Sequence, residues 1–380
     1  MAATGSNAAP PKVVRDHFTP LSARVLYAPE AVRGGDGLEH LVYEVVIENV
    51  STFPPRPVTV RDVIVKADGK TVQTLAGRQL QELMAPFGAV TEKTPRTTIQ
   101  PGGTAKVLMD VTYPAGAPLP RHLDHELVVS PGPSGSIELS RFAGAPTAVV
   151  THPALNIAPP LRGPGWVAIN GCCDEYTSHR SSLLSINGTL HAGERYAIDF
   201  VQMTAAGMLT DGPSNVLANY PFYGDEVFSS TAGVVVAIQD GLPDGPIDFD
   251  LPAREAGDAG GNYVVVMTGP HLFAFYGHLI PGSIKVRLHQ RVAVGAPLGL
   301  LGNSGNSNAP HLHFQLMDAP SPLGAEGIPY TFNSFTAEGR LTNFPYFFVR
   351  GKKAELATAP RGPKHRQLPL NFQVVDFPRP

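Results

Sequence analysis

Two histidines that are one residue apart, His311 and His313, are the first residues in this sequence whose spacing could support chemistry. In a β-strand, residues i and i+2 lie on the same face, so the two imidazoles would point the same way. Such a pair can provide a metal ligand and a catalytic neighbour. For an isolated pair, a solvated polar face is the better interpretation.

Further polar residues change that interpretation. Asp199 ends the apolar run 197–198, and carboxylates are rarely buried without a partner or a metal. His278 lies in another strand-like segment, and His179 precedes both. Two histidines and one carboxylate with an open fourth position are a ligand set that catalytic zinc uses. Together these residues predict a metal site more strongly than any of them does alone.

The elements that must position these residues are strands. From Trp166 onward the sequence contains short apolar runs separated by turn residues, and we expect a nearly all-β domain there. These runs are 196–200, 233–238, 263–267, 275–279 and 311–316. The loop 302–307 has turn chemistry and joins two strands, although its place before His311 could also shape a groove wall.

The N-terminal part is also strand-like, from about residue 22 to 131, with a possible helix only at 75–84. This spacing favours a β-sandwich, and the segment resembles immunoglobulin-like modules attached to extracytoplasmic bacterial enzymes. We therefore predict an all-β chain with two folded parts. The expected division is a disordered tail at 1–14, the sandwich at 15–131, a linker rich in Pro, Gly, Ser and Ala at 132–160, a second β domain at 161–355, and a C-terminal arm at 356–380.

Composition argues against several classes of partner. The chain has 29 basic and 32 acidic residues and no Lys/Arg run, so neither nucleic-acid binding nor an electrostatic membrane anchor is expected. No apolar run approaches the roughly 18 residues that a membrane span needs. Residues 1–14 do not have the build of a secretory signal, so the protein is either cytosolic or has lost such a signal.

The two cysteines, Cys172 and Cys173, are adjacent, which argues against a disulfide framework. Two buried free thiols are favoured over a vicinal disulfide, because bridging neighbours distorts the peptide between them. Zinc ligation by both is disfavoured, since adjacent residues in an extended chain point to opposite faces.

Several segments resemble the lysostaphin/LytM-type zinc metallopeptidases in their amino-acid sequence and in their order along the chain. They are 197–200, 227–235, 276–279, 294–299, 302–307 and 310–314, and the resemblance covers about residues 195–330. It implies an open antiparallel β architecture (a duplicated hybrid motif) with a groove for Zn2+. It also implies hydrolysis of peptide bonds in bacterial cell-wall peptidoglycan, and a periplasmic or secreted location.

The resemblance assigns roles to individual residues. Asp199 and His313 match the zinc ligands of the family, and His278 and His311 match its two catalytic histidines. The position of the first histidine ligand is held by Arg195, which stays protonated and cannot bind a metal.

A third ligand must therefore come from elsewhere. We favour His179 over His191, which lies in an expected exposed turn, and a site with no third ligand stays open. Arg195 itself could pair with Asp199, bind a substrate carboxylate or lie on the surface.

Two other functions compete with a zinc endopeptidase. Arg195 in a ligand position motivates a catalytically inactive domain that binds peptidoglycan or regulates an amidase. His278 and His311 could instead belong to a zinc-free histidine phosphotransfer-like β module, because phosphotransfer carriers share this general architecture. The sequence leaves the scissile bond, the oligomeric state and the role of the N-terminal part open.

Overall fold

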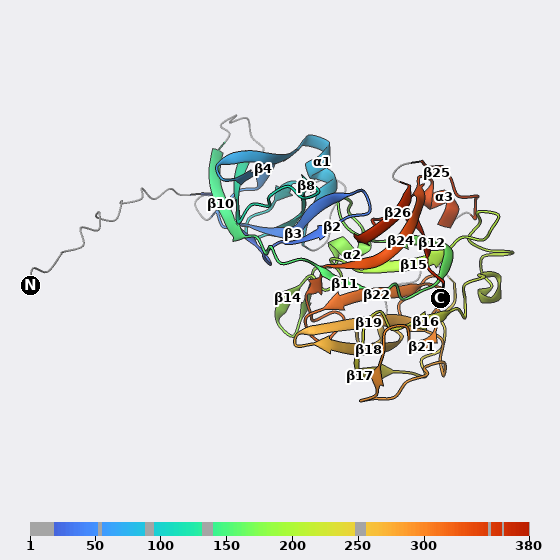
Figure 1. The fold of residues 1–380 in the computed structure, drawn as a ribbon. Coiled ribbons are helices and arrows are strands. Elements are labelled where there is room, and N and C mark those ends of the chain that lie inside the picture. The colour runs from blue at the N-terminus through green and yellow to red at the C-terminus, as the bar shows by residue number, and fades with distance from the viewer. Residues whose placement is uncertain are drawn as a thin grey trace, which may run out of the picture.

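The computed structural model describes residues 19–51, 55–87, 95–130, 140–247, 256–348, 351–358 and 361–379. The predicted tail at 1–14 lies outside these residues. The regular structure is almost entirely β-strand, which confirms the predicted all-β class. Figure 1 shows two lobes, an N-terminal lobe (described residues 19–148) and a C-terminal lobe (described residues 155–379).

Two five-stranded sheets enclose one apolar core in the N-terminal lobe. The first contains β1 (Leu21–Val25), β2 (Glu30–Arg33), β3 (Leu38–Asn49), β6 (Met84–Pro86) and β8 (Thr104–Pro114). The second contains β4 (Val58–Ala67), β5 (Lys70–Ala76), β7 (Thr98–Ile99), β9 (His122–Ser130) and β10 (Ser140–Ala148). In β4 buried residues alternate with more exposed ones, as expected for a sheet with one face on a core. The arrangement is a sandwich, and its likeness to immunoglobulin modules stays a prediction.

Part of the predicted linker is regular structure. β10 lies inside the range 132–160 and pairs with β9 in antiparallel register. The Gly- and Pro-rich composition predicted an irregular segment, but Phe142 of β10 packs against the sandwich core. Burial of that side chain and pairing with β9 outweigh the weak strand propensity of the segment.

The C-terminal lobe is organised by one 13-stranded, mostly antiparallel sheet. Along its main path the order is β11 (Leu155–Ile157), β24 (Tyr330–Leu341), β27 (Gln373–Phe377), β12 (Gly163–Ile169), β15 (Ile198–Gln202), β22 (Leu312–Met317), β19 (Leu272–Leu279), β18 (Asn262–Gly269), β17 (Gly233–Gln239) and β20 (Arg291–Val292). Three short strands join it at the sides: β23 (Gly327–Ile328), β25 (Leu356–Ala357) and β26 (Gly362–Gln367).

Small elements complete the described structure. There are two two-stranded sheets: the hairpin of β13 (Leu184–Ile186) and β14 (Thr189–His191), and the pair of β16 (Glu226–Phe228) and β21 (Pro297–Leu300), which are distant in sequence. The helices are short: α1 (Gly77–Leu83), α2 (Ser178–Ser181), α3 (Phe344–Phe348), and the 3-10 turns Leu217–Asn219 and Ala256–Asp258.

The segment 356–380, expected to be an arm beside the second domain, contributes strands to its sheet. β27 lies between β24 and β12, with Val374 and Val375 buried. The prolines of this segment suggested an extended arm that either packs on the domain or hangs free. In the structure the apolar residues of β27 leave water by completing the sheet. The domain division itself stays a prediction.

The two lobes share a buried interface. Val32 and Val42 of the N-terminal lobe belong to the same apolar cluster as the core of the C-terminal lobe. Backbone hydrogen bonds of 2.8 Å run from Gly35 N to Leu368 O and from Leu368 N to Arg33 O, where β2 approaches β26 (Figure 1). The N-terminal lobe is therefore packed against the C-terminal lobe rather than tethered beside it.

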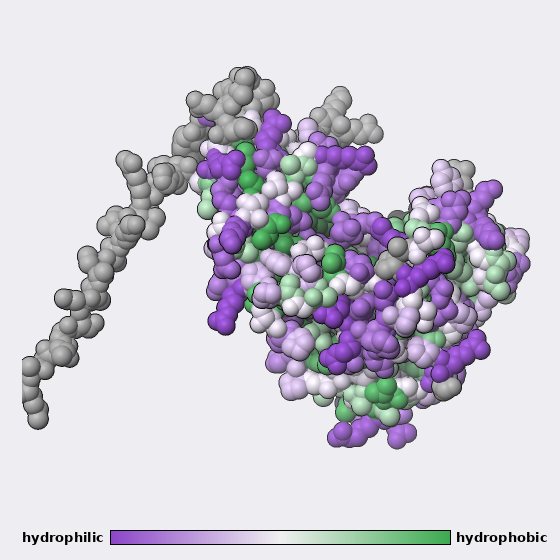
Figure 2. Space-filling model, turned by 45° about the horizontal axis from the view of Figure 1, so that its top comes forward, coloured by the Kyte–Doolittle hydropathy of each residue, from purple (hydrophilic) through white to green (hydrophobic). Residues whose placement is uncertain are grey.

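The surface in Figure 2 is largely hydrophilic, with apolar residues scattered among charged and polar ones. Scattered apolar residues are normal on a protein surface, in contrast to a broad apolar patch. Within the described part of the chain, no helix has the length and apolar character needed to cross a membrane.

Candidate active site

Strand register brings the first two site residues together. Asp199 of β15 lies directly opposite His313 of β22, and His313 lies opposite Gly277 of β19 on the other side. Directly opposed residues in an antiparallel pair have side chains on the same face, about 5 Å apart. Three neighbouring strands therefore present Asp199, His313 and the end of β19 to one point on the sheet.

The three residues predicted as metal ligands converge. His313 Nδ1 lies 3.0 Å from Asp199 Oδ1, and His179 Nε2 lies 3.2 Å from Asp199 Oδ2. One ligand atom from each residue fits within 4.8 Å of the others, and all three side chains are buried. His179 comes from α2, whose first turn is capped by Thr177 accepting a hydrogen bond from Arg180 N.

Each imidazole is oriented by a hydrogen bond from its other ring nitrogen. His179 Nδ1 donates to Ala197 O at 3.1 Å, which leaves Nε2 facing Asp199. His313 Nε2 donates to Gln315 Oε1 at 2.8 Å, which leaves Nδ1 facing the same carboxylate. Such outer hydrogen bonds fix the tautomer and ring orientation of metal-binding histidines. Both lone pairs are thus directed to one point.

Asp199 has one carboxylate oxygen satisfied and one that is not. Asn170 Nδ2 donates to Oδ2 at 2.8 Å. Oδ1 is buried, and its contacts with His311 and His313 do not have hydrogen-bond geometry. A buried oxygen without a partner costs free energy, and a cation among the three ligand atoms would satisfy it. The donor set of two nitrogens and one oxygen suits zinc.

The two predicted catalytic histidines stand beside this cluster. The ring centroids of His278 and His311 are 4.4 Å apart, and His311 Nε2 lies 3.4 Å from Asp199 Oδ1. His278 Nδ1 donates to Ser304 O at 2.7 Å, and His311 Nδ1 donates to Ala309 O at 2.8 Å. In both residues Nε2 is therefore the ring nitrogen that can accept a proton.

The backbone of His278 is strained, and the loop 302–307 holds it. Its φ of 62° is uncommon for a residue other than glycine and costs about 1–3 kcal/mol. His278 N donates to Gly260 O at 3.0 Å, and Gly302 N donates to His278 O at 3.0 Å. Gly305 in the same loop has a φ of +74°, and an added Cβ would lie 2.3 Å from Gly261 N. The loop therefore supports the site as well as joining two strands.

Electrostatics separate the roles of these groups. Burial raises the pKa of Asp199, but the nearby imidazoles of His179, His311 and His313 outweigh burial and hold that pKa well below its ordinary value. Burial lowers the pKa of His278 well below normal, and the nearby imidazoles of His311 and His313 lower it further. Burial also lowers the pKa of His311, against the opposing effect of Asp199. Neutral His278 and His311 thus face an ionised carboxylate.

A cavity of about 450 Å³ opens over the cluster. Its floor carries the five residues discussed above, and its walls include Asn170, Phe275 and Leu323. A mixed polar and apolar lining around convergent polar groups is typical of a ligand site. The cavity is large enough for a short peptide segment to approach the cluster.

The structure places the alternative ligand elsewhere. His191 Nδ1 lies 3.0 Å from Glu326 Oε1 and is not part of the cluster. Arg195 is buried, and its Nη2 lies 2.6 Å from Glu44 Oε2 and 3.4 Å from Glu326 Oε2. The three predicted settings for Arg195, a pair with Asp199, a substrate carboxylate or the surface, were therefore wrong. Its closer carboxylate partner, Glu44, comes from the other lobe, which no local pattern indicates.

Three residues that support the site, Gln315, Asn170 and Glu44, were not identified from the sequence. Gln315 follows His313 by two residues in one strand, so the i, i+2 rule could have indicated that it shares the same face. Asn170 and Glu44 carry no such signal. Glu44 is fully buried in β3 and pairs with both Arg195 and Arg180, the neighbour of His179.

The cysteines form a vicinal disulfide between Cys172 and Cys173, so the prediction of free thiols was wrong. That prediction assumed a trans peptide between them, whereas the bond is cis.

The sequence matches a family model, "Peptidase family M23", over residues 219–324. Residues 219–324 are thus similar to a peptidase family M23 domain. The match includes His278, His311 and His313, whereas His179 and Asp199 precede it. The resemblance to lysostaphin/LytM-type peptidases is thereby confirmed.

Known proteins similar to the M23 domain include the peptidoglycan DD-endopeptidase ShyA of Vibrio cholerae, which is 40% identical over 65 residues. That alignment covers 17% of this chain and 15% of ShyA, so the chain matches only a small part of that relative. Among solved structures, the lysostaphin catalytic domain from Staphylococcus simulans has 24% identity and a TM-score of 0.24, covering 38% of this chain and 80% of that one. A zinc-containing peptidase from Vibrio cholerae has 15% identity and a TM-score of 0.23, covering 73% and 77%. At such scores no residue role is transferred.

Proposed function

We propose that this protein is a zinc-dependent endopeptidase that hydrolyses peptide bonds in bacterial cell-wall peptidoglycan. The observation that supports it most is the convergence of His179, Asp199 and His313 around the unpartnered oxygen of Asp199. The M23 match and the peptidoglycan endopeptidase among the relatives support the substrate class. Such a substrate is found outside the cytoplasm, so we propose a periplasmic or secreted location.

In this proposal, His179 Nε2, one oxygen of Asp199 and His313 Nδ1 hold the zinc ion. Three protein ligands are the usual number in a catalytic zinc site, which leaves a position for water or substrate. The chemistry that zinc supplies in such a site is Lewis acidity, which acidifies water and polarises a carbonyl group.

The proton transfers belong to His278 and His311. Both are neutral at pH 7, because burial lowers their pKa values, and both keep Nε2 free. One Nε2 accepts the proton from the attacking water, and the resulting imidazolium can return it to the departing amine. While that imidazolium lasts, its Nε2–H can also donate to the carbonyl oxygen and stabilise the negative charge that develops there. The fixed Nδ1 hydrogen bonds keep both rings in place during these transfers.

The alternatives have different support. Arg195, which replaces a histidine ligand, suggested an inactive domain that binds peptidoglycan or regulates an amidase. In the structure Arg195 forms an ion pair with Glu44, which gives this arginine a structural role. A zinc-free phosphotransfer module would have no use for a buried Asp199 beside its histidines. We therefore retain the endopeptidase as the proposed function.

Metal content tests the ligand set. We expect the purified chain to hold about one zinc ion, and His313→Ala and His179→Ala to lose it. His191→Ala is the matched control and should keep its zinc, because His191 pairs with Glu326 instead. Equal zinc retention by His179→Ala and His191→Ala would overturn the assignment of His179.

Activity is tested on isolated peptidoglycan. The zinc-loaded protein should release soluble muropeptides, and His313→Ala should not. If the zinc-loaded protein binds peptidoglycan but cleaves neither it nor short glycine or D-alanine peptides, the non-catalytic alternative replaces the endopeptidase. If the purified protein binds no zinc at all, the phosphotransfer alternative gains support.

A further inference from the structure

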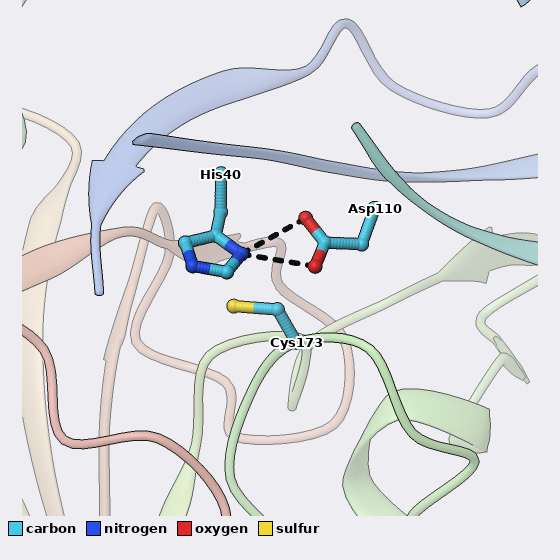
Figure 3. A group of neighbouring side chains, drawn as sticks. All are labelled: His40, Asp110 and Cys173. Atoms are coloured by element: carbon cyan, nitrogen blue, oxygen red, sulfur yellow. Dashed lines mark hydrogen bonds and ion pairs between the residues drawn. The ribbon is translucent and has the colours of Figure 1, made fainter. Parts of the chain in front are cut away.

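A second cluster of metal-binding residue types lies between the lobes, away from the proposed active site. One ligand atom each from His40, Asp110 and Cys173 fits within 4.8 Å of the others, and all three residues are buried. His40 and Asp110 come from the neighbouring strands β3 and β8, whereas Cys173 comes from the loop before α2 in the other lobe. Figure 3 shows the three side chains pointing toward one another.

The cluster borders a cavity of about 500 Å³, which gives a small ion a route to it. Asp36 and Asp174 also line this cavity, so the wall is rich in carboxylates. The lining residues also include Arg340, whose positive charge is paired with Glu175. The local charge around the cluster therefore favours a cation.

In the oxidised protein the cluster is satisfied without a metal. His40 Nδ1 lies 2.9 Å from Asp110 Oδ2, and Nε2 lies 3.2 Å from Asp36 Oδ1. Burial lowers the pKa of His40, but these two carboxylates outweigh burial and raise it to about 10. Cys173 is tied to Cys172 and has no thiolate to offer. A protonated His40 thus donates to both carboxylates and offsets part of their negative charge.

We propose that reduction of the Cys172–Cys173 disulfide creates a second zinc site, formed by the Cys173 thiolate, a ring nitrogen of His40 and a carboxylate oxygen of Asp110. A dithiol reductant supplies two electrons and two protons and becomes a disulfide, while Cys172 and Cys173 become thiols. Binding of the cation then releases the thiol proton of Cys173 and the extra proton of His40. Sulfur, imidazole and carboxylate together are ligands that zinc accepts.

Such a site would couple the lobes to the redox state. Its ligands come from both lobes, so a bound ion would join β3 and β8 to the loop that carries Cys173. Arg180 Nε donates to Cys173 O at 3.3 Å, and Arg180 follows His179 in α2. The proposed second zinc site is therefore linked by a hydrogen bond to α2, the helix that carries His179. The existence of this site does not depend on the proposed peptidase activity.

Two single variants separate the contributions of the two sulfur atoms. Both Cys172→Ser and Cys173→Ser abolish the disulfide with a minimal change in size, but only Cys172→Ser leaves a free thiol at position 173. Cys172→Ser should bind about one more zinc ion per chain than Cys173→Ser, with no reductant present. The wild-type chain should gain the same additional ion only after treatment with TCEP, a phosphine reductant. Zinc per chain is measured after removal of free metal.

Cobalt(II) provides a readout that does not depend on the first site. The proposed active site has no sulfur ligand, so a thiolate-to-cobalt charge-transfer band in Cys172→Ser would report the second site alone. The band should be missing in Cys173→Ser. Equal zinc binding by the two variants and no thiolate band in reduced wild-type protein would overturn the proposal. The reduced wild-type measurement decides the question if either variant fails to fold.

Discussion

Glu44→Gln should destabilise the protein far more than its single-atom change suggests. Glu44 and Arg180 have side chains with 0% exposure, and their Oε1 and Nη1 atoms are 2.6 Å apart. Arg195 Nε lies 3.0 Å from each carboxylate oxygen of Glu44. One buried carboxylate thus pairs with two guanidinium groups from the other lobe.

The expected loss follows from leaving Arg180 without its carboxylate partner and Arg195 with only the longer contact to Glu326. Removal of one partner from a buried ion pair costs about 3–5 kcal/mol. Glutamine keeps one acceptor oxygen, but its NH₂ group faces guanidinium donors, so we expect a loss of at least about 3 kcal/mol. This is a large fraction of the roughly 5–15 kcal/mol by which folded proteins are stable.

Urea unfolding, followed by the fluorescence of Trp166, measures this loss, because Trp166 is the chain's single tryptophan and is buried in the C-terminal lobe. Glu48→Gln is the matched control, since Glu48 is on the same strand but pairs with Arg24 at an exposed position. Exposed ion pairs contribute about 0–1 kcal/mol. If the two variants lose the same free energy of unfolding, the claim that Glu44 anchors the lobes is refuted.

The same residue predicts a pH dependence. Burial raises the pKa of Glu44, but Arg195 and Arg180 outweigh it and hold that pKa below its ordinary value. A depressed folded-state pKa contributes stability above the unfolded value of about 4.3, and this stability is lost as pH falls through the folded value. The difference in unfolding free energy between wild type and Glu44→Gln should therefore shrink as pH falls below about 4. A difference that stays constant down to acid denaturation would contradict the assignment.

Three further variants test the site and its support. Gln315→Ala should weaken zinc binding about 10–100-fold by freeing the ring of His313. The control Gln239→Ala, at a half-buried position of β17 outside the cluster, should leave zinc affinity unchanged in the same titration. His278→Ala should keep its zinc and lower the hydrolysis rate about 10²–10⁴-fold, so loss of the metal would instead make His278 a ligand. Phe314→Ala removes a fully buried ring beneath the site and should cost about 3–5 kcal/mol in urea unfolding, whereas a loss below about 1 kcal/mol would mean that this core is not closely packed.

Local patterns could predict the strands that carry the site. The alternation around His311 and His313 and the apolar residues before Asp199 identified β22 and β15, and the structure confirms the all-β class. The same reasoning did not identify β10 and β27 as strands, because it placed their residues in a linker and in a C-terminal arm. In both cases burial against an existing core decided the outcome, and burial depends on residues distant in sequence.

The choice between His179 and His191 shows the same limit. Neither histidine lies in a periodic element, so the sequence could only rank them. The structure settles their positions: His179 enters the cluster because its Nδ1 reaches Ala197 O, and His191 turns to Glu326.

The sequence by itself determined which side chains can bind a cation, which of them share a strand face, and which strands are apolar enough to be buried. Only the tertiary structure decided that Asp199 pairs in register with His313, that Glu44 meets an arginine 151 residues away, and that Cys173 lies beside His40 of the other lobe. The physical reason is that periodicity and propensity act over a few residues. Contacts between distant segments form only when whole sheets pack and the apolar surfaces of both lobes leave water together.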